Sequence, residues 1–320
     1  MNERDTRSSW LCCYPSMRSH LRYAFFLALG FVWMTGLEAK DDVDTELAAP
    51  KTSAQVATYD RMYGVTVDDL SNLPEIVDSL QKLPVRPWVR IVFHIEDDHT
   101  RYRRAVAAIS KVSAGIVGQP ADSTYVARLS LKAYSRRFRK FVDAFPEIDL
   151  WEIGNEINGD WLGGAVSSKI DAAFDIVKNA GRRSVLVPYW NRRTCADRNG
   201  YWLTWIDRNV SAKVKSGADY VLVSVYGMDC SGSEPSPSDV GRFYARLGRL
   251  FPHAALGIGE IGGSERASRR QRAVVLRYYL HLPKLHERDV FFGGYWFFRQ
   301  DMVPAGTELW KVLAKGMQPS

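Results

Sequence analysis

The chain has 320 residues, of which 46% are hydrophobic, and it carries a net charge of +7 at pH 7. This hydrophobic fraction is ordinary for a globular protein, so a sizeable core can form in one large domain or two small ones. Basic residues form two short clusters, at 136–140 and 266–272, both in helical stretches and without a nucleic-acid-binding motif. Nucleic acid is therefore not an expected partner, although an acidic polysaccharide or an anionic membrane surface is compatible with the charge.

The first predicted element is a targeting segment at residues 1–39. Basic residues precede an apolar run at 23–37, and small residues follow it up to Ala39. This order is typical of a secretory signal, and the run is shorter than the roughly 20 residues of a membrane span. We expect a secreted or periplasmic protein that is cleaved after Ala39, with no stable membrane span afterwards. An uncleaved anchor and a start at Met17 are the alternatives; residues 40–60 are predicted to be a linker or N-terminal arm.

Short apolar runs alternate with helical patterns over residues 61–320. The runs are β-branched and aromatic and are apolar nearly throughout, which is typical of strands buried on both faces of a parallel sheet. Eight such runs begin near Met62, Val89, Val112, Leu150, Val185, Tyr220, Ala255 and Phe291. The helical patterns lie at 124–145, 168–181, 238–250, 268–280 and 306–313.

The spacing of the later runs, about 35 residues, is the length of a strand, a loop, a helix and a second loop. Eight strands that alternate with helices predict an α/β fold, a (β/α)8 TIM barrel in a single domain. A doubly wound sheet would place a Gly-rich phosphate turn after an early strand, and the sequence contains none there.

The predicted strand ends supply two carboxyl groups. The fourth strand ends in Asn155 and Glu156, and the seventh ends in Glu260. Because barrel sites lie at the C-terminal strand ends, the two glutamates are predicted to face each other across the barrel mouth. Glycoside hydrolysis needs such a pair: one group protonates the leaving oxygen, and the other attacks or activates water. A single strand-end Glu is more often an ion-pair partner or a helix cap, but the pair favours catalysis.

Gly154-Asn155-Glu156 and Gly259-Glu260 resemble the corresponding strand ends of clan A of the glycoside hydrolases, the retaining (β/α)8 enzymes. The resemblance covers the whole predicted barrel and assigns no family within the clan. It implies that Glu156 is the acid/base, that Glu260 is the nucleophile, and that Asn155 binds the sugar 2-hydroxyl. It implies no metal or organic cofactor.

Other strands fit the resemblance in part. Tyr226 ends strand six, where clan members often place a Tyr that hydrogen-bonds the nucleophile, and Trp296 ends strand eight, where a Trp forms the floor of the −1 subsite. Arg90 in strand two resembles the clan's Arg that steadies the nucleophile, with a structural ion pair as its alternative. The clan often has a His at the end of strand three, but here His94 ends strand two. Either His94 takes over that role or the strand count is off by one in this region.

The loops suggest how a substrate is held. The polar segment His94–His99 lacks helical i,i+4 spacing and a third ligand group, so the wall of a sugar cleft is a better interpretation than a metal site. Trp161 and Trp190 are predicted to stack on sugar rings. Cys195 and Cys230, in neighbouring loops after strands five and six, are predicted to form a disulfide.

These residues together predict an exported retaining glycoside hydrolase, a monomer, that cleaves a polysaccharide or oligosaccharide. A non-catalytic carbohydrate-binding barrel and a transglycosidase that uses the same residues are the alternatives. The basic composition and the aromatic loops lean toward endo action on a polymer, whereas the sugar and the linkage do not follow from the sequence.

Overall fold

The computed structural model describes residues 62–228, 232–264, 266–290 and 292–317. The predicted signal segment and N-terminal arm lie outside these residues, so both stay predictions. None of the described helices is long and apolar enough to cross a membrane.

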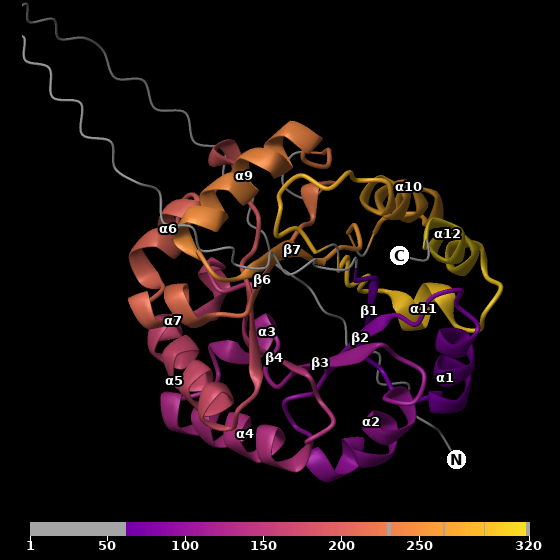
Figure 1. The fold of residues 1–320 in the computed structure, drawn as a ribbon, viewed down its shortest axis with the longest axis horizontal. Coiled ribbons are helices and arrows are strands. Elements are labelled where there is room, and N and C mark those ends of the chain that lie inside the picture. The colour runs from indigo at the N-terminus through magenta and orange to yellow at the C-terminus, as the bar shows by residue number, and fades with distance from the viewer. Residues whose placement is uncertain (1–61, 229–231, 265, 291, 318–320) are drawn as a thin grey trace, which may run out of the picture. The chain divides into compact units, whose positions relative to one another are not determined.

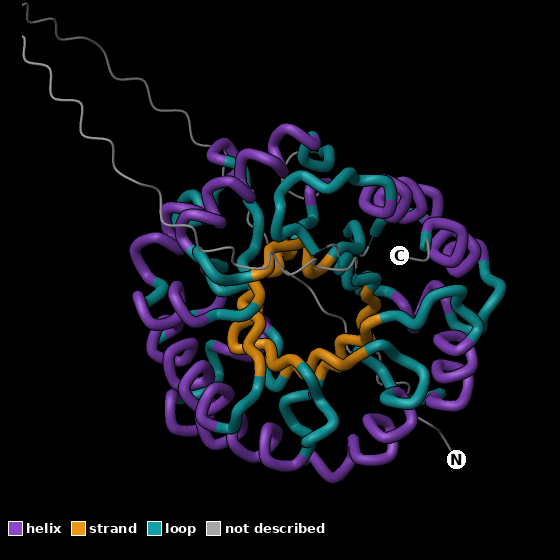
Figure 2. Tube along the Cα trace, viewed as in Figure 1, coloured by secondary structure: helices purple, strands orange, loops and turns teal. Residues whose placement is uncertain are grey.

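Seven parallel strands form one sheet in chain order, and the sheet curls into a ring with the helices outside it (Figures 1 and 2). The strands are β1 (Gly64–Val67), β2 (Trp88–Val92), β3 (Gly115–Gln119), β4 (Leu150–Asn155), β5 (Arg183–Val187), β6 (Tyr220–Ser224) and β7 (Ala255–Glu260). Nearly all their residues are buried, as the continuous apolar runs predict. The (β/α)8 fold predicted from the sequence is confirmed, and its eighth strand is irregular.

The segment at the eighth position differs from the predicted strand 291–298. Residues 292–297 contain no regular strand, and α11 (Phe298–Met302) begins within the predicted range. Gly293 and Gly294 have positive φ angles of 75° and 27°, which interrupt the extended backbone that a strand needs.

The ring nevertheless closes through Tyr295, which forms parallel bridges with both Val65 of β1 and Ile261 after β7. The N–H of Thr66 donates to the Tyr295 carbonyl at 2.9 Å, and the N–H of Trp296 donates to the Ile261 carbonyl at 2.9 Å. The N–H of Gly293 also donates to the Ile258 carbonyl at 2.7 Å, so a few backbone hydrogen bonds along this segment replace a full strand and place Trp296 at the mouth.

Helices cover the outside of the ring (Figure 1). Besides α11 they are α1 (Leu73–Gln81), α2 (Arg103–Ile109), α3 (Ser123–Val126), α4 (Leu131–Ala144), α5 (Val166–Asn179), α6 (Trp202–Asn209), α7 (Ala212–Gly217), α9 (Pro237–Leu250), α10 (Arg269–Leu280) and α12 (Glu308–Gly316). Three short 3-10 helices are η1 (His99–Tyr102), η2 (Asp160–Leu162) and η3 (Arg193–Cys195).

The pattern predicted as one helix at 124–145 is two helices, α3 and α4. Ser130 begins the second one, because its side chain accepts a hydrogen bond from the N–H of Ala133.

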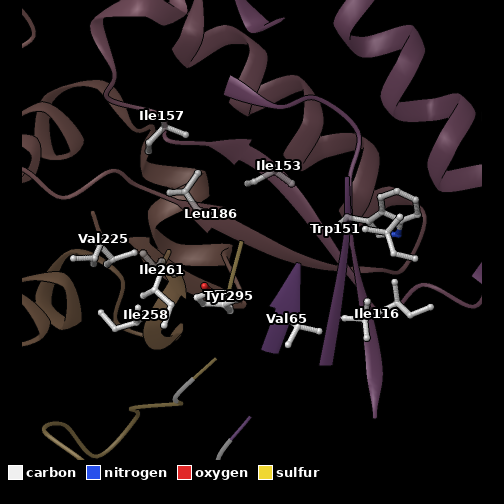
Figure 3. Close-up of a cluster of buried hydrophobic side chains, with 14 of the residues drawn as sticks. Val65, Ile116, Trp151, Ile153, Ile157, Leu186, Val225, Ile258, Ile261 and Tyr295 are labelled. Carbon is white, nitrogen blue, oxygen red and sulfur yellow. The ribbon is translucent and has the colours of Figure 1, made fainter. Parts of the chain in front are cut away.

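The apolar core has two parts. The larger cluster packs the outer faces of the strands against the helices, and Figure 3 shows part of it around Trp151 and Ile153. A smaller cluster consists of Met62, Val117, Leu150, Val185, Val187, Leu222, Ala255, Val290 and Phe292. Because these residues come from many strands around the ring, the cluster fills the barrel interior. Polar side chains replace apolar ones farther along the same strands, where the candidate site begins.

Candidate active site

Glu156 is the first residue after β4, and two hydroxyl groups hold its carboxyl group. Ser224 at the end of β6 donates to Oε1 at 2.8 Å, and Ser123 at the start of α3 donates to Oε2 at 2.9 Å. The backbone of Glu156 has a φ of 47°, a left-handed conformation that costs a non-glycine residue about 1–3 kcal/mol. The surrounding contacts must offset this cost, and such strain is often found at functional sites.

The pKa of Glu156 is raised to about 8, mainly by burial and also by the negative charge of Glu260, while the hydrogen bonds from Ser224 and Ser123 oppose this rise. The carboxyl group is therefore largely protonated at neutral pH. A protonated carboxyl group at a strand end can donate a proton to a leaving oxygen.

Glu260 is the last residue of β7 and is 5% exposed. The hydroxyl of Tyr226 donates to Oε1 at 2.6 Å, and the guanidinium of Arg90 donates to Oε2. Burial and the charge of Glu260 raise the pKa of Tyr226 well above its usual value, so the hydroxyl keeps its proton and stays a donor. Both contacts stabilise a negative charge on Glu260, as a nucleophile requires.

Arg90 lies in β2, is 1% exposed, and connects several groups at the mouth. Its Nε donates to Thr66 at 3.1 Å, and Nη1 lies 3.5 Å from Oε2 of Glu152 in β4. Its guanidinium carbon lies 5.3 Å from the ring centroid of Trp296. Burial disfavours the charge of Arg90, but the carboxylates of Glu260 and Glu152 outweigh that effect and raise its pKa.

Ser224 relates the two glutamates. It pairs in register with Glu260 on the neighbouring strand, while its hydroxyl donates to Glu156. Adjacent strands lie about 4.8 Å apart, so Ser224 lies beside Glu260 in the sheet while its hydroxyl contacts the carboxyl group of Glu156. The pair predicted from the strand ends is thus brought together at one end of the barrel, close enough for the charge of Glu260 to act on Glu156.

Asn155 ends β4 and is 3% exposed. Its Oδ1 accepts a hydrogen bond from the N–H of Ser123 at 2.9 Å, which fixes the start of α3 beside Glu156. Its Nδ2 has no hydrogen-bond partner among the described residues. The amide nevertheless interacts with the carboxyl group of Glu152 and lowers the pKa of that group.

The structure resolves the question of the strand count. β3 ends at Gln119, so the count predicted from the sequence is right, and His94 lies two residues beyond the end of β2. The side chain of His94 is exposed, and its Nε2 lies 2.7 Å from the carbonyl oxygen of Asp68. The position where the clan often has a His is thus occupied by Gln119, whose Nε2 donates to Asp122 at 3.4 Å.

Arg137 of α4 ties the loops after β2 and β3 together. Its guanidinium donates to the carbonyls of Phe93, His94, Ile95 and Asp97 in the first loop and of Pro120 in the second. The second loop leads directly to Ser123. Arg137 therefore helps to fix the hydroxyl that contacts Glu156, although it lies outside the barrel.

The predicted aromatic platforms differ from each other. Trp161 in η2 is partly exposed and packs edge-on to Tyr189, with 5.6 Å between ring centroids. Trp190 is 4% exposed and belongs to the larger core cluster, which leaves little ring surface for a sugar, unlike the stacking surface predicted for it. Cys230 lies outside the described residues, so its predicted disulfide with Cys195 stays a prediction.

Sequence reasoning assigned no contact with the predicted pair or its arginine to four residues: Thr66, Ser123, Ser224 and Glu152. Thr66, Ser224 and Glu152 lie in otherwise apolar strands, and a polar residue within a buried run is the signal that could have found them. Ser123 carried no such signal, because it is the first residue of the short helix α3 and not part of a strand. Among the described residues, no group of three or more His, Cys, Asp or Glu could hold a metal ion.

No family model and no curated protein matches the chain. Solved structures do. A Bacteroidetes-affiliated GH5 cellulase has a TM-score of 0.53 and 15% identity, over 78% of this chain and 84% of that one. A broad-specificity GH5-4 endoglucanase from an uncultured bacterium has a TM-score of 0.54 and 13% identity, over 82% and 95%. A GH30 endoxylanase from Clostridium papyrosolvens has a TM-score of 0.53 and 11% identity, over 81% and 72%.

At these identities the similarity shows the fold. The barrels that it identifies are glycoside hydrolases, in agreement with the resemblance of the strand ends to clan A.

Proposed function

We propose that this protein is an exported, secreted or periplasmic, retaining glycoside hydrolase that cleaves a polysaccharide. The observation that carries the proposal is the contrast between two carboxyl groups at one end of a barrel. Glu156 is protonated near neutral pH, whereas Glu260 is held by a guanidinium and a phenol that favour its charged form. Such a difference assigns the acid and the nucleophile.

In the first step, Glu260 attacks the anomeric carbon while Glu156 gives its proton to the leaving oxygen. The glycosidic bond breaks, and a glycosyl ester forms on Glu260. In the second step, Glu156, now a carboxylate, takes a proton from water, and the water oxygen displaces Glu260 from the sugar. Two displacements at the same carbon retain its configuration. Asn155, Trp161 and Trp296 are proposed to hold the sugar during both steps.

The similar structures serve only to choose the first substrates to be tested. Two of them, a GH5 lichenase from Caldicellulosiruptor and a GH5-4 protein, are described in complex with cellotetraose and cellotriose. We therefore place β-linked glucans and xylans first in the substrate panel, and acidic polysaccharides after them because of the net charge of +7.

The test is the release of reducing ends from this panel by the wild type and by Glu260→Gln, with the anomer formed first read by proton NMR. Wild-type hydrolysis with retention, and a loss of at least about 1,000-fold in the variant, is the expected result. Glu147→Gln is the matched control, because Glu147 is exposed in the turn that precedes β4, whereas Glu156 directly follows β4. An inverted product contradicts the double displacement. Glycan binding without any product indicates a carbohydrate-binding barrel instead, and transfer to a sugar acceptor indicates a transglycosidase.

A further inference from the structure

A third carboxyl group lies inside the barrel beside the proposed catalytic pair. Glu152, in the middle of β4, is 2% exposed, and its Oε2 lies 3.5 Å from Nη1 of Arg90. The other terminal nitrogen of Arg90 contacts Glu260. One buried guanidinium therefore serves two carboxyl groups on opposite sides of the barrel.

This arrangement is poorly explained by stability alone. Arg90 and Glu260 already balance each other, so Glu152 adds a second negative charge to a buried site, and burying such a charge is costly. Leu150, two residues earlier on the same face of β4, is apolar and packs in the inner cluster. A neutral side chain at position 152 would continue that cluster, yet the chain has a glutamate there.

We propose that Glu152 is a positioning residue for the nucleophile: by holding one side of Arg90, it limits the pull of the guanidinium on Glu260. The inference rests on the proposed function of the site. An arginine bound to Glu260 alone would stabilise the carboxylate strongly and so make it a weaker nucleophile. Sharing the guanidinium leaves more basicity on Glu260, while Arg90 still orients the attacking oxygen.

Glu152 has a second role after the first displacement. Glu260 then forms an ester with the sugar and loses its charge, so it no longer neutralises Arg90. Without another carboxylate partner, the guanidinium would then be a buried cation with no counter-charge. The sugar beside it carries positive charge in the next transition state, so the two like charges would repel each other. Glu152 is already in place to neutralise it, and no group has to move.

The charged and titratable groups around Glu152 agree with this role. Arg90 faces it from β2, Glu260 from β7, Asp122 from the loop after β3, and the neutral hydroxyl of Tyr134 from α4. The pKa of Glu152 is raised to about 7, mainly by burial; the charge of Arg90 opposes this rise, and the charge of Glu260 adds to it. The proton of Glu152 is therefore linked to the charge of Glu260 near neutral pH.

The test is the variant Glu152→Gln, which keeps the shape of the side chain and removes its charge. In protein labelled with 13C at the Glu carboxyl carbons, the Glu260 resonance is assigned by its absence in Glu260→Gln and then titrated. In the wild type, the Glu260 resonance should show an inflection near pH 7, where Glu152 gains its charge and shares Arg90, and this inflection should be absent in Glu152→Gln. A wild-type Glu260 resonance without this inflection overturns the proposal.

The kinetic counterpart is the pH profile of kcat/KM. The wild-type profile should show an inflection near pH 7, where Glu152 titrates, which is lost in Glu152→Gln, and the plateau of the variant should fall about tenfold. A purely structural role would lower the plateau of the variant without any such inflection in the wild type. Glu147→Gln should change neither.

Two further readouts keep the test decisive. If no glycan is hydrolysed by the wild type, the proposed function fails, but the NMR titration still shows whether the titration of Glu152 is felt at Glu260. If Glu152→Gln does not fold, the wild-type titration decides instead. The Glu260 resonance should then show a second inflection where Glu152 titrates, and a single inflection contradicts the coupling.

Discussion

The ends of β4 and β7 carry the same residue type in different surroundings. At the end of β4, Glu156 receives two serine hydroxyls on a strained backbone and is buried enough to keep its proton near neutral pH. At the end of β7, Glu260 continues a regular strand and receives a guanidinium and a phenol hydroxyl. The difference shows that neighbouring side chains, and not the glutamates themselves, give the two carboxyl groups the distinct surroundings that the proposed acid and nucleophile need.

The largest test of this comparison removes the proton donor. Glu156→Gln should lower kcat/KM on polysaccharides by about 10²- to 10⁴-fold, because the leaving alcohol oxygen then departs unprotonated. The loss should be much smaller for an aryl glycoside with an acidic phenol, which needs no proton to leave. Comparing the two substrates in the variant and in the control Glu147→Gln measures this. An equal loss on both substrates would place Glu156 outside the acid role.

A smaller effect is expected at the other end of the comparison, from Tyr226→Phe. A hydrogen bond to a charged group contributes about 1.5–3 kcal/mol, so kcat/KM should fall about 10- to 100-fold. Loss of the donor also disfavours the charged form of Glu260, so the acidic limb of the pH profile should move to higher pH, a change that Glu152→Gln should not produce.

Tyr220→Phe is the control for Tyr226→Phe, since Tyr220 is the first residue of β6 and lies at the opposite end of that strand from the site. An acidic limb that stays in place in Tyr226→Phe contradicts the contact.

The smallest expected effect is on stability. The pKa values of Glu156 and Glu152, about 8 and about 7, exceed the ordinary 4.5, so the folded protein holds protons that the unfolded chain releases. Stability should therefore be greatest below about pH 4.5 as far as these two groups are concerned, and it should fall as the pH rises toward 8. Glu156→Gln removes part of this dependence, and its Tm at pH 8 should exceed that of the wild type by about 2–4 °C. Calorimetry of both proteins at pH 5 and pH 8 checks this, and equal slopes would refute it.

The sequence predicts the fold well where one signal suffices. Continuous apolar runs located seven strands, and Ser268 marked the start of α10, where it forms a capping box with Gln271.

The eighth strand was mispredicted, because its aromatic residues favour a strand, whereas the φ angles of its two glycines interrupt one. At the site, Glu156, Glu260 and their relation could be predicted from strand ends.

The surroundings of those carboxyl groups could not be predicted in the same way. Ser123 reaches Glu156 from the start of α3, 33 residues earlier in the chain, and only the folded ring brings it there. The sharing of Arg90 is likewise invisible in the sequence, since Glu152 read alone is a scaffold residue within a buried strand.

The segment that closes the ring through Tyr295 comes late in the sequence, so a growing chain completes the site late. Strands β4 and β7, with both carboxyl groups, leave the ribosome before residues 292–297 do. Tyr295 and Trp296 then supply the last bridges and the ring that faces Arg90 within two consecutive positions. A nascent or truncated chain that stops short of this segment would carry both glutamates on an open sheet. Completion of the ring and completion of the proposed site therefore both depend on the same late segment of the chain.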